Sequence, residues 1–132
     1  GDLGGGGEEE DGVAVFCRMR LSKKIEERVA LIFYVMHHVS VIPKDFKIPH
    51  IGWNALHVCK ENKLFRYVNE GDFVYFVHSY YATDCDESLL ATTEYGQELT
   101  AAVAYGNVMG CQFHPEKSGS VGLSILRAFC EE

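Results

Sequence analysis

Short apolar segments separated by turn residues fill the C-terminal half of the sequence, and they restrict the chain to a fold built on a β-sheet. Residues 73–78 and 89–93 have the length and the β-branched and aromatic content of strands. Residues 100–104 and 108–113 flank a short turn that contains Gly106, which predicts a β-hairpin. Because residues 73–78 are almost continuously apolar, we expect that strand to be buried on both faces.

The chain ends in an amphipathic segment, which we expect to form a helix that packs on this sheet. Ser118 or Ser120 is placed to cap the helix, since a serine hydroxyl accepts hydrogen bonds from first-turn N–H groups. Strands followed by a helix predict an α/β fold, in which ligands bind at the carboxyl ends of strands. The apolar side chains of the helix recur at helical spacing and share one face: Val121, Ile125, Leu126 and Phe129.

Length, charge and cysteine content limit the class of protein. The 132 residues are enough for one domain, and a formal net charge of −7 argues against a nucleic-acid-binding surface. The 5 cysteines form neither a C-x-x-C pair nor a zinc-ligand spacing, so we expect free thiols, no metal and a reducing cytoplasm. The longest apolar run, residues 29–36, is too short to cross a bilayer, and we expect no membrane segment.

The chain changes character near residue 43. Residues 1–12 are rich in glycine and acidic residues, which predicts a mobile segment. Residues 22–41 begin with good helix formers and continue with β-branched and aromatic residues, which favours a helix that passes into a strand. The adjacent His37 and His38 cannot point to one side of a helix or strand, so they do not indicate a metal site.

His114 and Glu116 are the candidate chemical groups. They follow the apolar segment 108–113, and side chains two positions apart on an extended chain face the same way. A carboxylate beside an imidazole is suited to proton transfer. Cys111 is a poor candidate for the nucleophile, because positions three apart face opposite ways and its neighbours are apolar. The simpler alternative is that His114 only satisfies the hydrogen bonds of a turn.

Five segments carry a resemblance to a known family. They are residues 47–54 (KIPHIGWN), 74–81 (VYFVHSYY), 91–96 (ATTEYG), 100–103 (TAAV) and 110–119 (GCQFHPEKSG). From about residue 43 to the C-terminus, the chain resembles the glutaminase subunits of imidazole glycerol phosphate synthase, which are class I glutamine amidotransferases of histidine biosynthesis. The last segment alone would indicate only the amidotransferase class, and the first two narrow the resemblance to this subunit.

The resemblance implies a flavodoxin-like α/β fold and a Cys-His-Glu triad that hydrolyses L-glutamine through a thioester. The ammonia passes to a (β/α)₈ cyclase partner, and the reaction needs no cofactor. His114 matches the general base and Glu116 the orienting acid, while Ser79 and Tyr80 match the segment that holds glutamine. The motifs that line the surface facing the cyclase contain Trp53, Asn54, Tyr75, His78 and Lys117.

The chain also departs from this family. It contains no Gly-x-Cys-x-Gly elbow, the motif that carries the nucleophile and part of the oxyanion hole. Residues 13–42 match the family poorly and are either divergent or translated from a shifted reading frame. We therefore expect residues 43–132 to be the C-terminal part of an amidotransferase domain, incomplete at its N-terminal side and inactive alone. Two alternatives are a non-catalytic module that binds the cyclase and a glutaminase domain of another class I amidotransferase.

Overall fold

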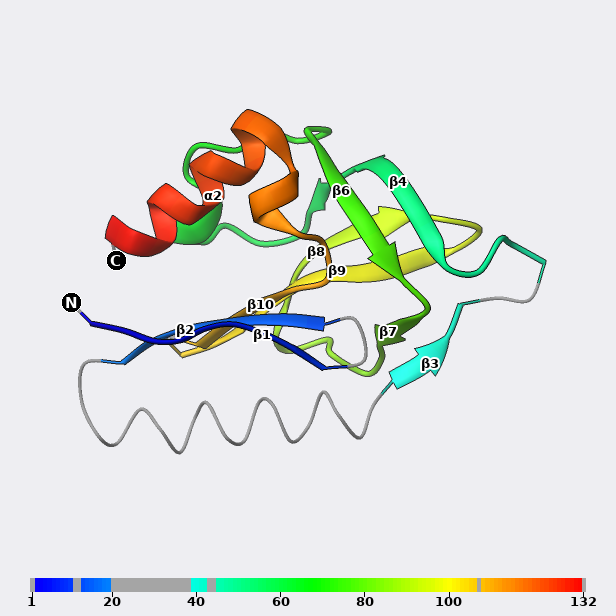
Figure 1. Cartoon of the computed structure of the whole chain (residues 1–132), viewed down its shortest axis with the longest axis horizontal. Coiled ribbons are helices and arrows are strands. Elements are labelled where there is room, and N and C mark those ends of the chain that lie inside the picture. The colour runs from blue at the N-terminus through cyan, green and yellow to red at the C-terminus, as the bar shows by residue number, and fades with distance from the viewer. Residues whose placement is uncertain (1, 11–12, 20–38, 43–44, 107, 132) are drawn as a thin grey trace.

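Antiparallel pairing connects the strands of the main sheet (Figure 1). The computed structural model describes residues 2–10, 13–19, 39–42, 45–106 and 108–131. Within them, six strands are ordered β1-β2-β10-β9-β8-β5, and each neighbouring pair is antiparallel. The bounds of these strands are Asp2–Glu10 (β1), Val13–Met19 (β2), His57–Val58 (β5), Leu89–Glu94 (β8), Glu98–Tyr105 (β9) and Val108–Cys111 (β10).

Two small antiparallel sheets and a C-terminal helix accompany the main sheet. β3 (Val39–Val41) pairs with β7 (Tyr80–Ala82), and β4 (His50–Ala55) pairs with β6 (Phe73–His78). A helix packed against strands confirms the α/β class that the sequence predicts. The helical elements of the described residues are η1 (Lys63–Phe65), η2 (Pro115–Lys117) and α2 (Gly119–Glu131), of which the first two are 3₁₀ turns.

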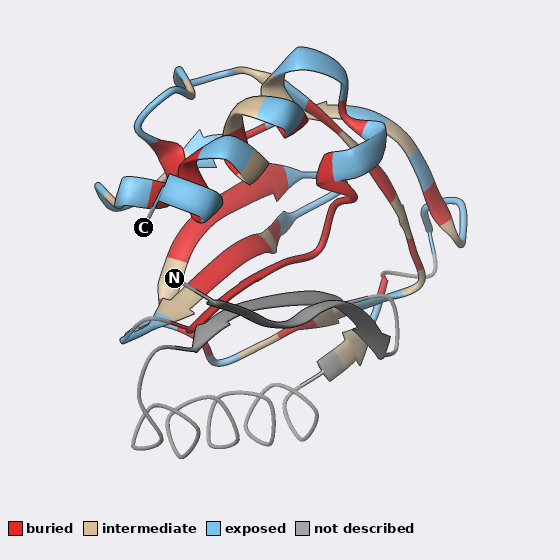
Figure 2. Ribbon diagram, turned by 60° about the vertical axis from the view of Figure 1, so that its left-hand side comes forward, coloured by how far each residue is buried: buried red, intermediate tan, exposed pale blue. Residues whose placement is uncertain are grey.

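The core lies between α2 and the main sheet, where Figure 2 shows buried residues on the facing surfaces. Ile125 and Phe129 of α2, with Leu64 and Phe65 of η1, belong to one buried cluster with side chains from the strands. Full burial of such a side chain contributes roughly 1.5–3 kcal/mol, so this cluster fixes α2 on the sheet. Its other members are Leu56, Val74, Phe76, Leu90, Ala91, Ala101, Ala102, Met109, Cys111 and Phe113.

The predicted strands are present, but one of them is less buried than expected. β9 and β10 form the predicted hairpin, and β8 covers the predicted strand at residues 89–93. The expectation that residues 73–78 are buried on both faces is wrong. Phe76 of β6 is fully buried, whereas Phe73 is 55% exposed. The reason is that β6 belongs to a two-stranded sheet, whose outer face nothing in the described structure covers.

α2 forms where the sequence predicts a helix, but neither serine caps it. Ile125 and Phe129 are buried as expected. The Ser118 hydroxyl instead donates to a carbonyl and accepts an N–H outside the helix, as described below. Ser120 lies inside α2, one residue after its first position. The tertiary contacts of Ser118 therefore replace the local cap that the sequence pattern suggested.

The N-terminal expectations meet the structure only in part. Residues 2–10, part of the segment expected to be mobile, form β1 and pair with β2. A β-ladder is made by main-chain groups, so a glycine-rich acidic segment can pair without burying apolar side chains. β3 agrees with the expected strand at the end of the 22–41 segment. The helix expected before it, together with His37 and His38, lies outside the described residues.

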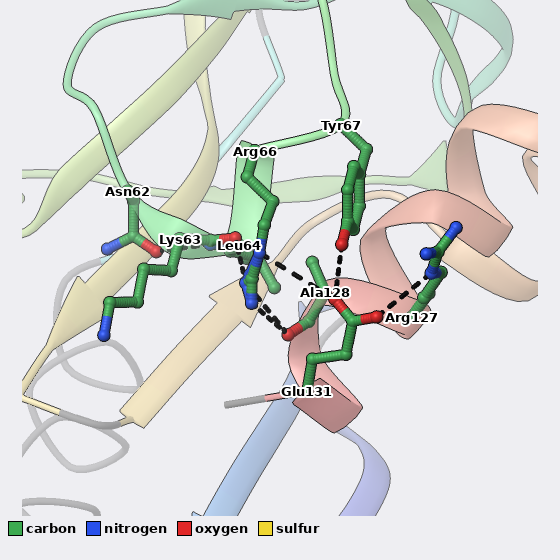
Figure 3. Close-up of polar contacts among 8 residues, drawn as sticks. All are labelled: Asn62, Lys63, Leu64, Arg66, Tyr67, Arg127, Ala128 and Glu131. Atoms are coloured by element: carbon green, nitrogen blue, oxygen red, sulfur yellow. Dashed lines mark hydrogen bonds and ion pairs between the residues drawn. The ribbon is translucent and has the colours of Figure 1, made fainter.

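Polar contacts hold the C-terminal end of α2 to the segment that follows η1 (Figure 3). The Arg66 guanidinium donates from Nη2 to the Ala128 carbonyl at 3.0 Å. The Tyr67 hydroxyl donates to the Glu131 carboxylate at 2.5 Å, and Arg127 donates to the same carboxylate at 3.1 Å. A cation at the carboxyl end of a helix satisfies a terminal carbonyl and interacts favourably with the helix dipole. These contacts fix the end of α2 that lies away from His114.

Candidate active site

His114 lies between β10 and η2, and β6 fixes its position. The His114 N–H donates to the Tyr75 carbonyl at 3.0 Å. The His114 carbonyl accepts the Ser118 hydroxyl at 2.6 Å, and Ser118 Oγ accepts the Tyr75 N–H at 2.9 Å. Both main-chain polar groups of Tyr75 are therefore used to hold the loop. A ligand or a partner that moved β6 would also move His114.

The imidazole of His114 and the carboxylate of Glu116 meet as the sequence predicts. His114 Nδ1 lies 3.2 Å from Glu116 Oε2. The His114 side chain is 9% exposed, whereas that of Glu116 is 56% exposed. A carboxylate at Nδ1 favours the tautomer with a proton on that nitrogen, so that Nε2 is the basic nitrogen of the neutral ring. This is the arrangement of a general base with its orienting acid.

Gly122 allows α2 to approach the His114 loop closely. A Cβ atom at this position would lie 1.8 Å from the Pro115 carbonyl oxygen and 2.9 Å from Ser118 Cβ. A carbonyl oxygen of the main chain cannot move aside as a flexible side chain can. The first turn of α2 thus rests directly on η2, and the His114 loop is fixed from this side as well.

Ser79 and Tyr80 lie where the chain passes from β6 to β7, and their main chain is held from two directions. The Ser79 carbonyl accepts the Ile42 N–H at 3.0 Å. The Tyr80 carbonyl accepts a hydrogen bond from His78 Nδ1 at 2.8 Å. Burial lowers the pKa of His78 to about 4, and the nearby charges of His50 and His114 add to the shift. The main chain of the segment expected to hold substrate is therefore fixed by Ile42 and His78.

A buried pair of imidazoles, His50 and His78, lies behind this segment. Their side chains meet at 2.8 Å across the β4–β6 pair, and the residues are 1% and 3% exposed. The expectation that His78 lines the surface facing a partner is wrong, because alternate residues of β6 face opposite sides and His78 shares the inner side with Phe76. Sequence reasoning missed the pair because the pairing of β4 with β6 is not fixed by local patterns.

The outer face of the β4–β6 sheet is apolar and open. Ile51, Trp53 and Phe73 are 54%, 51% and 55% exposed. Trp53 and Tyr75, both predicted to face a partner, lie opposite each other with ring centroids 5.9 Å apart. We call this face the β4–β6 surface, and the register of the two strands assigns to it Ile51, Trp53, Ala55, Phe73, Tyr75 and Val77.

The β4–β6 surface adjoins the His114 loop. A Cβ atom at Gly119 would lie 3.8 Å from the Trp53 ring. Lys117 is exposed at the end of η2. Asn54 differs from its neighbour Trp53, since its side chain turns towards the inner face and its Oδ1 lies 2.7 Å from His50 Nε2. Trp53 and Lys117 are thus exposed and Tyr75 is half-buried, whereas the Asn54 side chain contacts the buried His50. That these residues face a partner stays a prediction.

Neither of the buried cysteines in the described residues, Cys85 and Cys111, has an activated thiol. Cys111 is 2% exposed, and burial raises the pKa of its thiol, which confirms that it is a small buried hydrophobe. Burial also raises the pKa of Cys85. Cys59 and Cys130 are exposed, and all four thiols are free. The structure does not describe the side chain of Cys17 in β2.

The residues that the structure describes contain neither a candidate metal site nor a helix suited to a membrane. In them, no three side chains of His, Cys, Asp or Glu are grouped so that they could hold a metal ion. Within the same residues, no helix has the length and apolar character needed to span a membrane.

An imidazole held by a carboxylate beside a segment with a fixed main chain defines an acid–base site on an α/β scaffold. A histidine paired with a glutamate is the geometry that the base and the acid of a nucleophile–base–acid triad require. The chain belongs to the class I glutamine amidotransferase family, because the family described as "Glutamine amidotransferase class-I" matches residues 15–132. The α/β layers are consistent with the flavodoxin-like fold that this family implies.

The curated relatives named here share one description, "Imidazole glycerol phosphate synthase subunit HisH". The protein of Lactococcus lactis is 48% identical over 110 residues, which are 83% of this chain and 54% of the relative. Those of Methanosarcina acetivorans and Methanosarcina mazei are 51% and 53% identical over 100 residues, which are 74% of this chain and 50% of each relative. The chain therefore spans about half the length of the curated relatives it matches.

Proposed function

We propose that this chain is part of the glutaminase subunit of imidazole glycerol phosphate synthase, which acts in histidine biosynthesis. The observation that carries the proposal is the 3.2 Å contact between His114 and Glu116, placed within a class I amidotransferase sequence. The names of the relatives support the choice of synthase. The four free cysteines with described side chains support a reducing, cytoplasmic setting.

His114 would carry the proton in the reaction. As the base, it takes the proton of a cysteine thiol, whose thiolate attacks the carboxamide carbon of glutamine. The same proton then goes to the departing nitrogen, the C–N bond breaks, and ammonia leaves a thioester behind. Water, deprotonated by His114, hydrolyses the thioester to glutamate and restores the thiol. Glu116 keeps the ring oriented and stabilises its positive charge in both steps.

The glutamine itself would lie against the Ser79–Tyr80 segment. The Ser79 and Tyr80 carbonyls are held by Ile42 and His78. A main chain fixed in this way presents its remaining groups to a ligand without further loss of conformational freedom. β6, whose Tyr75 carbonyl accepts the His114 N–H, leads directly into this segment, so a substrate held there would lie near the base.

The β4–β6 surface would bind the cyclase partner. Large exposed apolar side chains gathered on one sheet face are typical of a protein interface. Trp and Tyr are frequent anchors of such interfaces, and Trp53 lies against Tyr75 here. The surface ends beside Gly119 and Lys117, so the bound cyclase would lie next to the loop that releases ammonia.

Binding to the purified cyclase subunit tests the proposal, with isothermal titration as the measurement. Trp53→Ala should weaken binding at least tenfold, because an aromatic anchor contributes about 2 kcal/mol or more. Leu123→Ala is the matched control, since Leu123 is 65% exposed on α2 and lies outside the β4–β6 surface. Equal binding by the two variants, or no binding by the unchanged chain, would contradict the interface.

A second candidate function follows from the missing nucleophile motif. The chain contains no Gly-x-Cys-x-Gly elbow, so we infer that it does not hydrolyse glutamine alone. A chain that binds the cyclase and yields no ammonia would act as a non-catalytic module. Assays of glutamate release, with and without the cyclase, separate the two functions. If hydrolysis occurs, Cys17→Ser tests the cysteine whose side chain the structure does not describe.

A glutaminase domain for another synthase is the remaining alternative. In that case the chain would bind a different acceptor subunit and leave the cyclase unbound. The relatives named above favour the imidazole glycerol phosphate synthase, as do residues 47–54, which the β4–β6 surface includes in part.

A further inference from the structure

Three contacts in series connect β7 to β4 through the interior. The Tyr80 carbonyl lies 2.8 Å from His78 Nδ1. His78 Nε2 lies 2.8 Å from His50 Nδ1, and His50 Nε2 lies 2.7 Å from Asn54 Oδ1. One end of the series is the segment proposed to hold glutamine, and the other is the strand that carries Trp53.

The number of N–H protons on the two imidazole rings determines the charge of the pair. Each end is an oxygen that only accepts, so each of the three contacts requires a ring N–H of its own. Two neutral imidazoles have two N–H groups, whereas a pair with one additional proton has three. An Asn54 side chain that directs Oδ1 at His50 therefore requires a pair that carries one positive charge.

The surroundings of the pair oppose this charge. Burial lowers the pKa of both His50 and His78. Phe76 and Tyr95 stack on the His50 ring, with centroids 5.0 Å and 3.9 Å away, and a positive charge on His114 would further disfavour a proton on His78. In the described part of the chain, no carboxylate bonds to either ring. A neutral pair leaves one of the three contacts without a hydrogen; when the two protons fill the other contacts, the lone pair of His50 Nε2 faces an oxygen 2.7 Å away, which is repulsive.

A half-turn of the Asn54 amide removes this repulsion. Asn54 then donates from Nδ2 to His50 Nε2, so that two ring protons satisfy the whole series. The turn breaks the 3.2 Å bond from Asn54 Nδ2 to the Glu94 carbonyl. That bond is exposed, so water can replace it. The two-proton and three-proton pairs thus select opposite orientations of one amide.

We propose that His50 and His78 are positioning residues: they hold the Tyr80 main chain, and their proton count sets the orientation of the Asn54 amide. A partner that fixes this amide from the β4 side would change the proton affinity of the pair, and with it the bond that holds Tyr80. The link to glutamine rests on the proposed function, whereas the proton count and the amide orientation do not.

Long-range ¹H–¹⁵N NMR of the full chain with ¹⁵N-histidine counts the ring protons directly. At pH 7.5 we expect both rings to carry their proton on Nδ1, the opposite of the tautomer that free histidine prefers. On acidification, His50 Nε2 should gain a proton together with a shift of the Asn54 side-chain amide signals. Asn54→Asp presents oxygens only, so it should raise the proton affinity of the pair more than tenfold.

Asn69→Asp is the matched control, because Asn69 is exposed and the change adds the same charge. A proton on His78 Nε2 in the unchanged chain would overturn the proposal. So would equal titration of the pair in Asn54→Asp and Asn69→Asp. If Asn54→Asp does not fold, the pH titration of the unchanged chain is the test. Asn54 side-chain amide signals that stay constant while His50 gains its proton would contradict the coupling. None of these results depends on the cyclase. A failed cyclase-binding experiment would therefore contradict the proposed function and leave this proposal unaffected.

Discussion

The main-chain N–H of His114 donates a 3.0 Å hydrogen bond to the carbonyl of Tyr75, and this bond joins the candidate base to a strand of a different sheet. Tyr75 also contributes its ring to the β4–β6 surface. One residue therefore connects the proposed partner surface with the loop that carries His114. A partner that binds this surface acts directly on the residue that fixes His114.

Ser118→Ala tests how this link is held. The change removes the hydroxyl that accepts the Tyr75 N–H at 2.9 Å and donates to the His114 carbonyl at 2.6 Å. Ser118 is 1% exposed, so water cannot readily take its place. We expect a loss of about 1–3 kcal/mol in the free energy of unfolding, measured by urea denaturation. Ser120→Ala, at an exposed position of α2, should have little effect, and equal losses would contradict the role of Ser118.

Gly122→Ala should destabilise the protein, although alanine normally stabilises a helix relative to glycine by about 1 kcal/mol. The added methyl group would lie 1.8 Å from the Pro115 carbonyl oxygen, so α2 must move away from η2. We expect a net loss of roughly 1–3 kcal/mol by urea denaturation, as for other overpacked sites. Leu123→Ala, at the neighbouring exposed position, should change stability little. A Gly122→Ala variant as stable as the unchanged chain would show that the helix does not rest on the loop.

The sequence predicts the elements whose pattern is local. The β9–β10 hairpin follows from a glycine turn between apolar segments, and the His114–Glu116 contact follows from their spacing. The His50–His78 pair could not be predicted, because it depends on the register of β4 with β6, which tertiary packing decides. The same register places His78 inside, where motif reasoning had put it on the surface. Residues 20–38 lie outside the described structure, so the helix expected there stays a prediction.

Thiol reactivity tests whether Cys111 can act as a nucleophile. Its burial and the raised pKa of its thiol predict no reaction with a maleimide in the folded protein. Cys59 and Cys130 are exposed and should react at once. Peptide mapping by mass spectrometry before and after unfolding in urea gives the answer for each cysteine. Rapid native labelling of Cys111 would contradict the packing of β10 against α2.

The exposed pair of His57 and Glu70 should contribute to stability only within a limited pH range. Their side chains meet at 2.7 Å, and Glu70 raises the pKa of His57 through a hydrogen bond and its charge. The Val58 N–H and His57 lower the pKa of Glu70. The contribution of His57 is complete below 6.5 and is lost as pH rises through its higher native pKa. That of Glu70 is complete above 4.5 and is lost as pH falls through its lower native pKa.

A double-mutant cycle with His57→Gln and Glu70→Gln measures this contribution. We expect the coupling between the two residues to be largest between pH 4.5 and 6.5, the ordinary pKa values of the two groups. Because both side chains are exposed, added salt should weaken it. Coupling that persists unchanged at pH 9 would show that the two side chains interact without charge.

His78 should make the protein less stable as the pH falls. Its pKa lies near 4 in the folded chain, chiefly because of burial, against an ordinary value of 6.5. Between these values the unfolded chain binds a proton that the folded chain does not, so stability falls as pH decreases and is constant above 6.5. The loss attributable to His78 is about 3 kcal/mol at most. Urea denaturation of the unchanged chain and of His78→Gln from pH 4 to 8 gives the slopes, and His78→Gln should show the flatter dependence. Parallel slopes would mean that His78 takes up its proton equally in both states, and the buried pair would then not be held neutral by its surroundings.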